Sequence, residues 1–189
     1  MSNDSGPVVI DLFCGAGGLS EGLRQAGFRP VVGVDFDKHA AATYRHNHPG
    51  VPVIEGSVEH VTGQQLMALA GVSEIDLIAG GPSCQGFSTH GKRMQDDPRN
   101  FLFKHFVRLV DEVRPKMFLM ENVKGMLTYG KGAFRRQIEE AFKEIGYRTD
   151  FAHVLAADYG VPQMRHRILF IGTRIDGLRL SFPKPTHGD

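Results

Sequence analysis

The chain has 189 residues, 41% of them hydrophobic and 23% charged, which predicts one soluble domain with enough apolar side chains to form a core. The formal net charge is +1, so the chain lacks the strong basic excess of a dedicated nucleic-acid binder, and contact with a polyanion would depend on local clusters such as Arg165-His166-Arg167. Two cysteines, and no apolar run long enough for a signal peptide or a membrane span, predict a cytoplasmic protein without a structural disulfide.

Short apolar runs alternate with amphipathic stretches, which is the pattern of βαβ units around a mostly parallel sheet. We expect seven strands, at Val8 to Phe13, Pro30 to Val34, Val53 to Ile54, Asp76 to Ile78, Lys116 to Glu121, Arg148 to Leu155 and Arg167 to Arg174. We expect five helices, at Leu19 to Ala26, Lys38 to His46, Gln64 to Ala70, Asn100 to Val113 and Ala133 to Ile145. The fourth helix carries an apolar stripe that we assign to core packing rather than base stacking, formed by Phe103, Phe106, Val107, Val110 and Val113.

The first predicted strand continues into a glycine-rich turn, Asp11 to Ser20, which opens a helix and lets a ligand approach the backbone closely. Such a turn suits NAD, FAD or S-adenosylmethionine. Asp35, about twenty residues further on at the end of the second strand, has the spacing of an acid that accepts hydrogen bonds from ribose hydroxyls, although a helix N-cap is the alternative. Ser20 stands where a dinucleotide site has its third glycine, which disfavours NAD, and Phe36 could stack on an adenine.

A cysteine lies on a second turn, Gly80 to Gln85, directly after the buried run Ile75 to Ala79. A turn at the carboxyl end of a strand exposes the sulfur of Cys84, as a nucleophile requires. The alternative is a small buried hydrophobic residue.

The nine histidines occur without a CxxC or HExxH spacing, so we expect no metal site. The segment His46-Asn47-His48 is interpreted as the end of a helix and a turn before Pro49.

Four segments stand in a fixed order along the chain: Asp11 to Gly18, Gly80 to Ser88, Glu121-Asn122-Val123 and Gln163 to Arg167. They resemble the signature motifs of the cytosine-C5 DNA methyltransferases, and the resemblance covers nearly the whole chain. It implies an α/β, Rossmann-like methyltransferase fold with a mostly parallel seven-stranded sheet, helices on both faces and an antiparallel final strand. It also implies S-adenosylmethionine as cofactor and double-stranded DNA as partner, with the target cytosine flipped out of the duplex, as in restriction-modification.

The resemblance implies four catalytic residues. Cys84 would add to carbon 6 of the cytosine, and Glu121 would hold and help protonate ring N3, so that the charge produced by the attack is neutralised. Arg167 is assigned to the cytosine O2 and the surroundings of Cys84, and Arg165 to a phosphate or to support of the site. Near a bend in the chain, both arginines can face the site. We assign removal of the C5 proton to an ordered water.

The resemblance also implies the binding residues. Those for the cofactor are Phe13, Gly15, Ala16, Gly17, Gly18, Leu19, Asp35, Phe36, Ser57, Val58, Gly80, Pro82 and Leu102. Those for the substrate are Gln85, Ser88, His90 and Asn122, with Gly86 and Gly91 as hinges of a loop that closes over DNA. Two positions depart from the family: Ser57 replaces an aspartate that contacts the adenine, and Ser83 replaces a proline beside the nucleophile.

We divide the chain into a disordered lead-in (1–6), a methyltransferase domain (7–181) and a linker (182–189). The family continues into a target-recognition domain and two further motifs, the last of which completes the catalytic domain. We therefore expect a second polypeptide or a longer gene product to carry target recognition, and a surface open to partners or self-association. Two alternatives stay open, a non-catalytic partner of an active methyltransferase and a tRNA cytosine methyltransferase.

Overall fold

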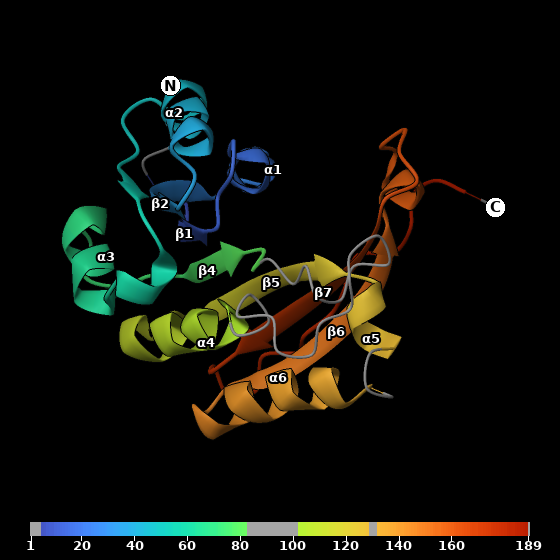
Figure 1. The fold of residues 1–189 in the computed structure, drawn as a ribbon. Helices are drawn as coiled ribbons and strands as arrows, with labels where there is room; N and C mark the ends of the chain where they lie inside the picture. The colour runs from blue at the N-terminus through green and yellow to red at the C-terminus, as the bar shows by residue number, and fades with distance from the viewer. Residues whose placement is uncertain (1–4, 83–101, 129–131, 189) are drawn as a thin grey trace.

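The computed structural model describes residues 5–82, 102–128 and 132–188, which form a seven-stranded sheet with helices on both faces (Figure 1). The strand order is β3-β2-β1-β4-β5-β7-β6, and β7 runs antiparallel to both of its neighbours while the other strands are parallel to one another. The strands are β1 (Val8–Leu12), β2 (Arg29–Asp35), β3 (Val53–Glu55), β4 (Leu77–Gly80), β5 (Met117–Val123), β6 (Arg148–Leu155) and β7 (His166–Thr173). The predicted fold class is confirmed, including the antiparallel final strand.

The helices follow the βαβ alternation that the sequence predicts. The α-helices are α1 (Gly18–Gln25), α2 (Lys38–Asn47), α3 (Gly63–Ala70), α4 (Leu102–Val113), α5 (Gly125–Thr128) and α6 (Ala133–Glu144). Two 3₁₀ helices, η1 (Val58–His60) and η5 (Ala156–Tyr159), lie in the connections. The five predicted helices are confirmed within a few residues of their expected bounds, except that Asn100 lies outside the described residues. The structure adds α5, η1 and η5.

The two faces of the sheet are covered to different extents. On one face α3, α4 and α6 pack over a large core, and the predicted stripe of α4 is buried in it. On the other face α1 and α2 lie together, because Ser20 of α1 and Tyr44 of α2 are hydrogen bonded at 2.7 Å. Figure 1 shows these two helices above the β1–β2 end of the sheet and α4 and α6 beneath it. None of the described helices lies over β7 and β6 on the α1 side.

The strands β5 and β7 show this difference directly. In β5, Phe118, Met120 and Asn122 are buried, whereas the residues that alternate with them are half-buried. In β7, Ile168 and Phe170 are buried, whereas Leu169 and Ile171 are half-buried. Because alternate residues of a strand face opposite sides, the α1 side of these strands is partly open.

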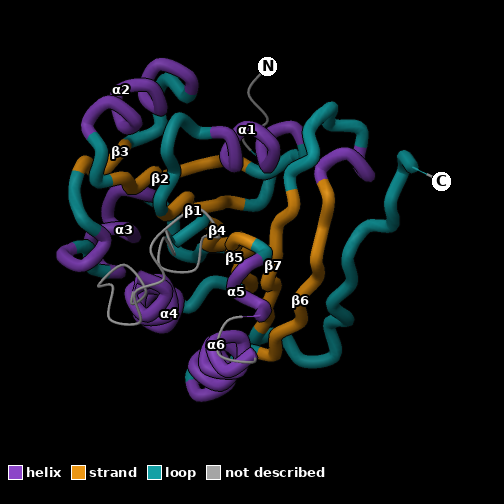
Figure 2. Tube along the Cα trace, turned by 45° about the vertical axis from the view of Figure 1, so that its right-hand side comes forward, coloured by secondary structure: helices purple, strands orange, loops and turns teal. Residues whose placement is uncertain are grey.

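The segment after β7 runs back along the outside of β6 (Figure 2). Arg148, at the start of β6, donates hydrogen bonds to the carbonyls of Ile175 and Leu178, both at 2.9 Å. At the other end of β6, the backbone N–H groups of Thr186 and His187 both donate to Asp158 O of η5 at 2.9 Å. The segment predicted as a linker is thus hydrogen bonded to η5, after the carboxyl end of β6, as far as residue 187.

Within the same described ranges, no three His, Cys, Asp or Glu side chains gather into a group that could hold a metal ion. No helix in this part of the chain is long and apolar enough to cross a membrane.

Candidate active site at the carboxyl edge of the sheet

The glycine-rich turn has the backbone conformation that a close-fitting ligand site requires. Phe13, Gly15 and Gly17 have φ angles of 61°, 55° and 93°, and the turn continues directly into α1 with Gly17 as its N-cap. Ala16 and Gly18 are exposed on the turn, and Phe13, Gly15 and Leu19 are half-buried. A left-handed backbone favours glycine, which explains the residue type at positions 15 and 17.

Asp35 holds this turn against the second strand. Its Oδ2 accepts the backbone N–H of Gly15 at 2.8 Å, and its Oδ1 accepts that of Asp37 at 2.9 Å. The N-cap of α2 is Asp37, which accepts from His39 N and Ala40 N, so the N-cap alternative for Asp35 is wrong. A carboxylate has about four acceptor positions, so Asp35 can still accept a further hydroxyl.

The surroundings of Asp35 suit an adenosine group. Phe36, the next residue, is 73% exposed, which is unusual for a phenyl ring and leaves one face free for a planar ligand. Ser57 caps η1 by accepting from Glu59 N at 3.3 Å, so its hydroxyl is already used locally. Val58 is buried, and Leu102, at the start of α4, packs against the core.

The end of β4 brings the second turn to the same edge. Gly80 pairs with Leu12 of β1 and Met120 of β5, and a Cβ atom at Gly80 would lie only 2.2 Å from Leu12 O. Pro82 is buried directly after it. Cys84, Gln85, Ser88 and His90, together with Ser83, Gly86 and Gly91, lie outside the described residues.

Glu121 on β5 lies directly beside the start of this turn. A Cβ atom at Gly81 would be 2.9 Å from Glu121 Oε2, so the carboxylate lies against the backbone of Gly81. The other oxygen, Oε1, accepts a hydrogen bond from Arg167 Nε and lies 3.6 Å from a terminal nitrogen of Arg165. Arg165 lies just before β7 and Arg167 is the second residue of that strand, and both guanidinium groups reach one carboxylate.

Asn122 has a different position from its neighbour Glu121. It is 2% exposed, its Nδ2 donates to Pro82 O at 3.2 Å, and its Oδ1 accepts from Val123 N at 2.8 Å. The side chain therefore fixes the backbone of the turn that leads to Cys84, instead of facing outward.

A buried polar network beneath the glycine-rich turn was missed by the sequence analysis. Asp11 Oδ2 accepts from Ser20 Oγ at 2.7 Å, and Ser20 Oγ is bonded to Tyr44 OH. The second oxygen of Asp11 is buried without a hydrogen-bond partner in the described part of the chain. Burial raises the pKa of Asp11 to about 7 and raises the pKa values of Cys14 and Tyr44 as well. Cys14 is 5% exposed and so is not placed to act as a nucleophile.

The end of α2 also contacts the turn, which the sequence analysis did not predict. Asn47 Nδ2 donates to Ala16 O at 2.8 Å, and His48 Nε2 lies 3.1 Å from Gly17 O. The available signal was the i, i+3, i+4 spacing of these residues with Tyr44, which puts all three on one side of the helix.

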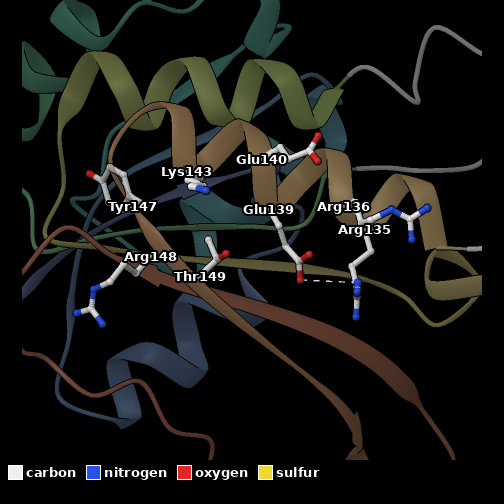
Figure 3. Close-up of a pocket in the computed structure, with 8 residues that line it drawn as sticks. All are labelled: Arg135, Arg136, Glu139, Glu140, Lys143, Tyr147, Arg148 and Thr149. Atoms are coloured by element: carbon white, nitrogen blue, oxygen red, sulfur yellow. Dashed lines mark ion pairs between the residues drawn. The ribbon is translucent and has the colours of Figure 1, made fainter.

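A charged cavity of about 550 Å³ lies away from this edge, between α6 and the start of β6 (Figure 3). Arg135 lies 3.7 Å from Glu139 there, and its guanidinium lies over the ring of Phe151. β6 starts at the edge opposite to the glycine-rich turn, so this cavity is separate from the candidate site.

Comparison with known proteins gives consistent matches over nearly all of the chain. Residues 8–186 match the family model described as C-5 cytosine-specific DNA methylase. The type II methyltransferase M.XorII of Xanthomonas oryzae is 49% identical over 186 residues, which cover 95% of this chain and 43% of that protein. M.AquIA of Picosynechococcus, also a type II methyltransferase, is 45% identical, and the match covers 95% of this chain and 77% of that protein.

A solved structure supports the same relationship. A prophage-encoded protein of E. coli, whose name describes a DNA modification methyltransferase, superposes with a TM-score of 0.77 at 38% identity, covering 88% of this chain and 46% of that one. The chain spans about half the length of the first curated relatives it matches. Because the family model matches far more than half of its residues, the chain belongs to the C-5 cytosine-specific DNA methylase family.

Proposed function

We propose that this chain supplies the cofactor-binding and catalytic part of an S-adenosylmethionine-dependent methylation of cytosine C5 in DNA. The observation that carries the proposal is the position of the Glu121 carboxylate. One of its oxygens lies against Gly81, which precedes Cys84 by only three residues, and two guanidinium groups share the other oxygen. An acid beside a cysteine-bearing turn is the pair that covalent addition to a pyrimidine requires.

In this proposal Cys84 Sγ, as thiolate, forms a bond to carbon 6 of the flipped cytosine. Electron density moves toward carbon 5, and Glu121 donates or shares a proton at ring N3, so that no isolated negative charge develops. S-adenosylmethionine supplies the methyl group for carbon 5. A water takes the C5 proton, the Cys84 bond to carbon 6 breaks, and the proton at ring N3 returns to Glu121, which restores the ring.

The arginines have distinct proposed roles. Arg167, bonded to Glu121 Oε1 and 24% exposed, orients the carboxylate and contributes positive charge near Cys84 and the cytosine O2. Arg165 is 49% exposed, so it is better placed to reach a phosphate while it supports the same carboxylate. Gln85, Ser88 and His90 remain proposed DNA contacts, and Asn122 is proposed to position the turn of Cys84.

The cofactor fits the residues at the other end of the edge. The left-handed positions at Gly15 and Gly17 and the exposed backbone at Ala16 and Gly18 suit the methionine part, whereas Asp35 and Phe36 suit the ribose and adenine. The hydroxyl of Ser57 is a weaker acceptor for the adenine amino group than a carboxylate would be.

A further segment, from the same protein or from a second polypeptide, is proposed to cover the open half of the sheet and to carry target recognition. Leu169 and Ile171 of β7 are partly exposed on the α1 side of the sheet, opposite Glu121 and Leu119 of β5. Leu119 itself packs against the apolar cluster of Val9, Leu77 and Ala79. Apolar side chains left partly exposed beside each other can mark an interaction site. The domain bounds 7–181 and a cytoplasmic location are kept as predictions.

The test is covalent trapping on duplex DNA that contains 5-fluorocytosine, with S-adenosylmethionine present. Fluorine at carbon 5 prevents the final elimination, so a working nucleophile leaves a stable protein–DNA adduct. The reaction is run with the chain alone and with a fragment of M.XorII that carries the region beyond the match, because the active unit is proposed to need it.

Cys84→Ala should abolish the adduct, and Glu121→Gln should slow its formation by roughly 10² to 10⁴. Cys14→Ala is the matched control and should leave the adduct unchanged, since Cys14 is buried with a raised thiol pKa. An adduct that survives Cys84→Ala would reject Cys84 as the nucleophile. No adduct under either condition, with folding verified, would reject the proposal in favour of a non-catalytic partner. A parallel reaction on 5-fluorocytosine tRNA that proceeds while the DNA reaction fails would favour the RNA substrate.

A further inference from the structure

One side of α2 lies against the glycine-rich turn and contacts two consecutive carbonyl groups. Asn47 Nδ2 donates to Ala16 O at 2.8 Å, and the next residue, His48, reaches Gly17 O at 3.1 Å. A carbonyl oxygen can only accept, so His48 Nε2 carries a proton and acts as the donor. Two side chains at the end of one helix thus hold the backbone of the turn at two adjacent peptide units.

The contact is close enough to determine the residue type in the turn. A Cβ atom at Gly17 would lie 2.3 Å from His48 Nε2 and 3.1 Å from the ring of Tyr44. His48 is 5% exposed, and its ring lies 4.5 Å from that of Tyr44, centroid to centroid. The imidazole is therefore fixed by packing on one side and by Gly17 O on the other.

Holding these carbonyls also sets the direction of the amides. Gly17 O also accepts the first helical hydrogen bond of α1, from Glu21 N at 2.8 Å, so His48 and α1 together fix the direction of this carbonyl. In a trans peptide the N–H of the next residue, Gly18, then points the opposite way. Gly18 is exposed and is the first residue of α1, where backbone N–H groups have no acceptor within the helix. The end of α2 therefore helps the first turn of α1 to present the Gly18 N–H to whatever binds above the turn.

We propose that Asn47 and His48 are positioning residues for the methionine part of the cofactor, acting through the glycine-rich turn. This inference rests on the proposed function, because it needs S-adenosylmethionine to bind at the turn. It predicts that loss of either donor weakens binding of the methionine part and leaves binding of the adenosine part intact, because the adenosine residues Asp35 and Phe36 do not contact either side chain.

The test measures binding of S-adenosylhomocysteine and of adenosine by calorimetry, with the full chain. Asn47→Asp keeps the size of the side chain but replaces the donor with an acceptor that faces Ala16 O. His48→Phe keeps a ring against Tyr44 but has no donor. Each should weaken S-adenosylhomocysteine binding by about fivefold and change adenosine binding less than twofold, as expected for loss of one hydrogen bond.

Two controls separate positioning from stability. His48→Gln retains an amide donor of similar reach, so it should bind S-adenosylhomocysteine more tightly than His48→Phe does and with most of the wild-type affinity. His46→Ala removes an exposed histidine two residues away on the same helix and should change neither ligand. Backbone amide NMR of the cofactor-free protein adds an independent readout, with the Gly17 and Gly18 signals expected to move in Asn47→Asp and His48→Phe.

The outcomes are distinguishable. Equal weakening of both ligands together with a lowered melting temperature would mean that the two residues only stabilise the fold, and unchanged binding of both ligands would reject the inference as well. If the wild type binds neither ligand, the cofactor step of the proposed function is rejected, and this inference with it.

Discussion

Asp11 is a carboxyl group in the interior of the sheet, 1% exposed, with one oxygen bonded to Ser20 and the other unpaired within the described residues. Desolvation disfavours its charged form and raises its pKa from 3.8 to about 7, in spite of the bond from Ser20. Because the folded-state pKa is above the unfolded value, this carboxyl group favours the folded state fully only below the unfolded pKa. The contribution is lost as the pH rises through 7.

We therefore expect Asp11→Asn to remove part of the pH dependence of stability. The wild type should lose melting temperature between pH 5 and pH 8, where Asp11 becomes charged, and the variant should lose less. At pH 8 the variant should be the more stable of the two, since an amide carries no charge to desolvate. Thermal unfolding followed by circular dichroism at pH 5, 6, 7 and 8 measures this directly.

Asp37→Asn is the matched control for Asp11→Asn. Backbone N–H groups of Ala40 and His39 lower the pKa of Asp37, so its stabilising effect is lost only as the pH falls through a value below 3.8. Its melting temperature should therefore differ from that of the wild type by a constant amount between pH 5 and pH 8. The same pH slope in wild type and Asp11→Asn would contradict the assignment to Asp11.

At this scale the sequence singled out Glu121, Arg165 and Arg167, and the structure brings both guanidinium groups to the Glu121 carboxylate, whereas their catalytic roles stay predictions. The contacts from the end of α2 to the glycine-rich turn were missed. Asn47 and His48 could not be assigned, because a polar residue at a helix end has many uses and the long-range contact to the turn depends on how two helices pack.

At the scale of elements, β5 and β7 pack closely because one residue of β7 is a glycine. Gly172 of β7 lies opposite Phe118 of β5, and a Cβ atom there would be 2.1 Å from the phenyl ring. Phe118 in turn stacks on Phe142 of α6, with ring centroids 3.7 Å apart. The strand pair and the helix therefore depend on a glycine at this position.

Gly172→Ala should destabilise the protein by about 1–3 kcal/mol, because the ring of Phe118 has to move within a close-packed core. Urea unfolding of the two proteins gives the difference in the free energy of unfolding. Gly22→Ala makes the same chemical change in α1, where the residue is exposed and nothing lies within 4 Å of the new atom. It should stabilise the protein by up to about 1 kcal/mol through helix propensity. Equal effects of the two substitutions would show that the space at Gly172 is not limiting.

Element type was predictable wherever the hydrophobic pattern extends over enough residues. The seven strands and the five long helices are confirmed, and the amphipathic stripe of α4 is buried as expected. α5, η1 and η5 have four residues or fewer, which is too short for any periodic pattern to be visible.

At the scale of the whole molecule, the sheet is covered unequally, and this asymmetry was not readable from the pattern of apolar residues. Leu169 and Ile171 alternate with Ile168 and Phe170 along β7, yet only the second pair is fully buried. A strand of continuous apolar residues is typical of a sheet covered on both faces. The sequence of β7 thus indicates a cover on the α1 side that none of the described helices provides.

We expect the double variant Leu169→Lys/Ile171→Lys to distinguish an effect on docking of a further segment from an effect on folding of this chain. These two side chains are already partly buried within this chain, so the double variant should lose roughly 2–3 kcal/mol of stability. Phe170→Ala, on the same strand but facing the core, should lose about 3–5 kcal/mol.

If the open face receives the further segment, the lysine variant should also fail to bind the M.XorII fragment and fail to gain adduct formation from it, because two charges would be buried unpaired. Sedimentation of the mixed proteins measures the binding. A lysine variant that binds the fragment as tightly as the wild type would assign the docking surface to another part of the molecule, and one that unfolds like Phe170→Ala would mean that this face is already covered in the chain alone.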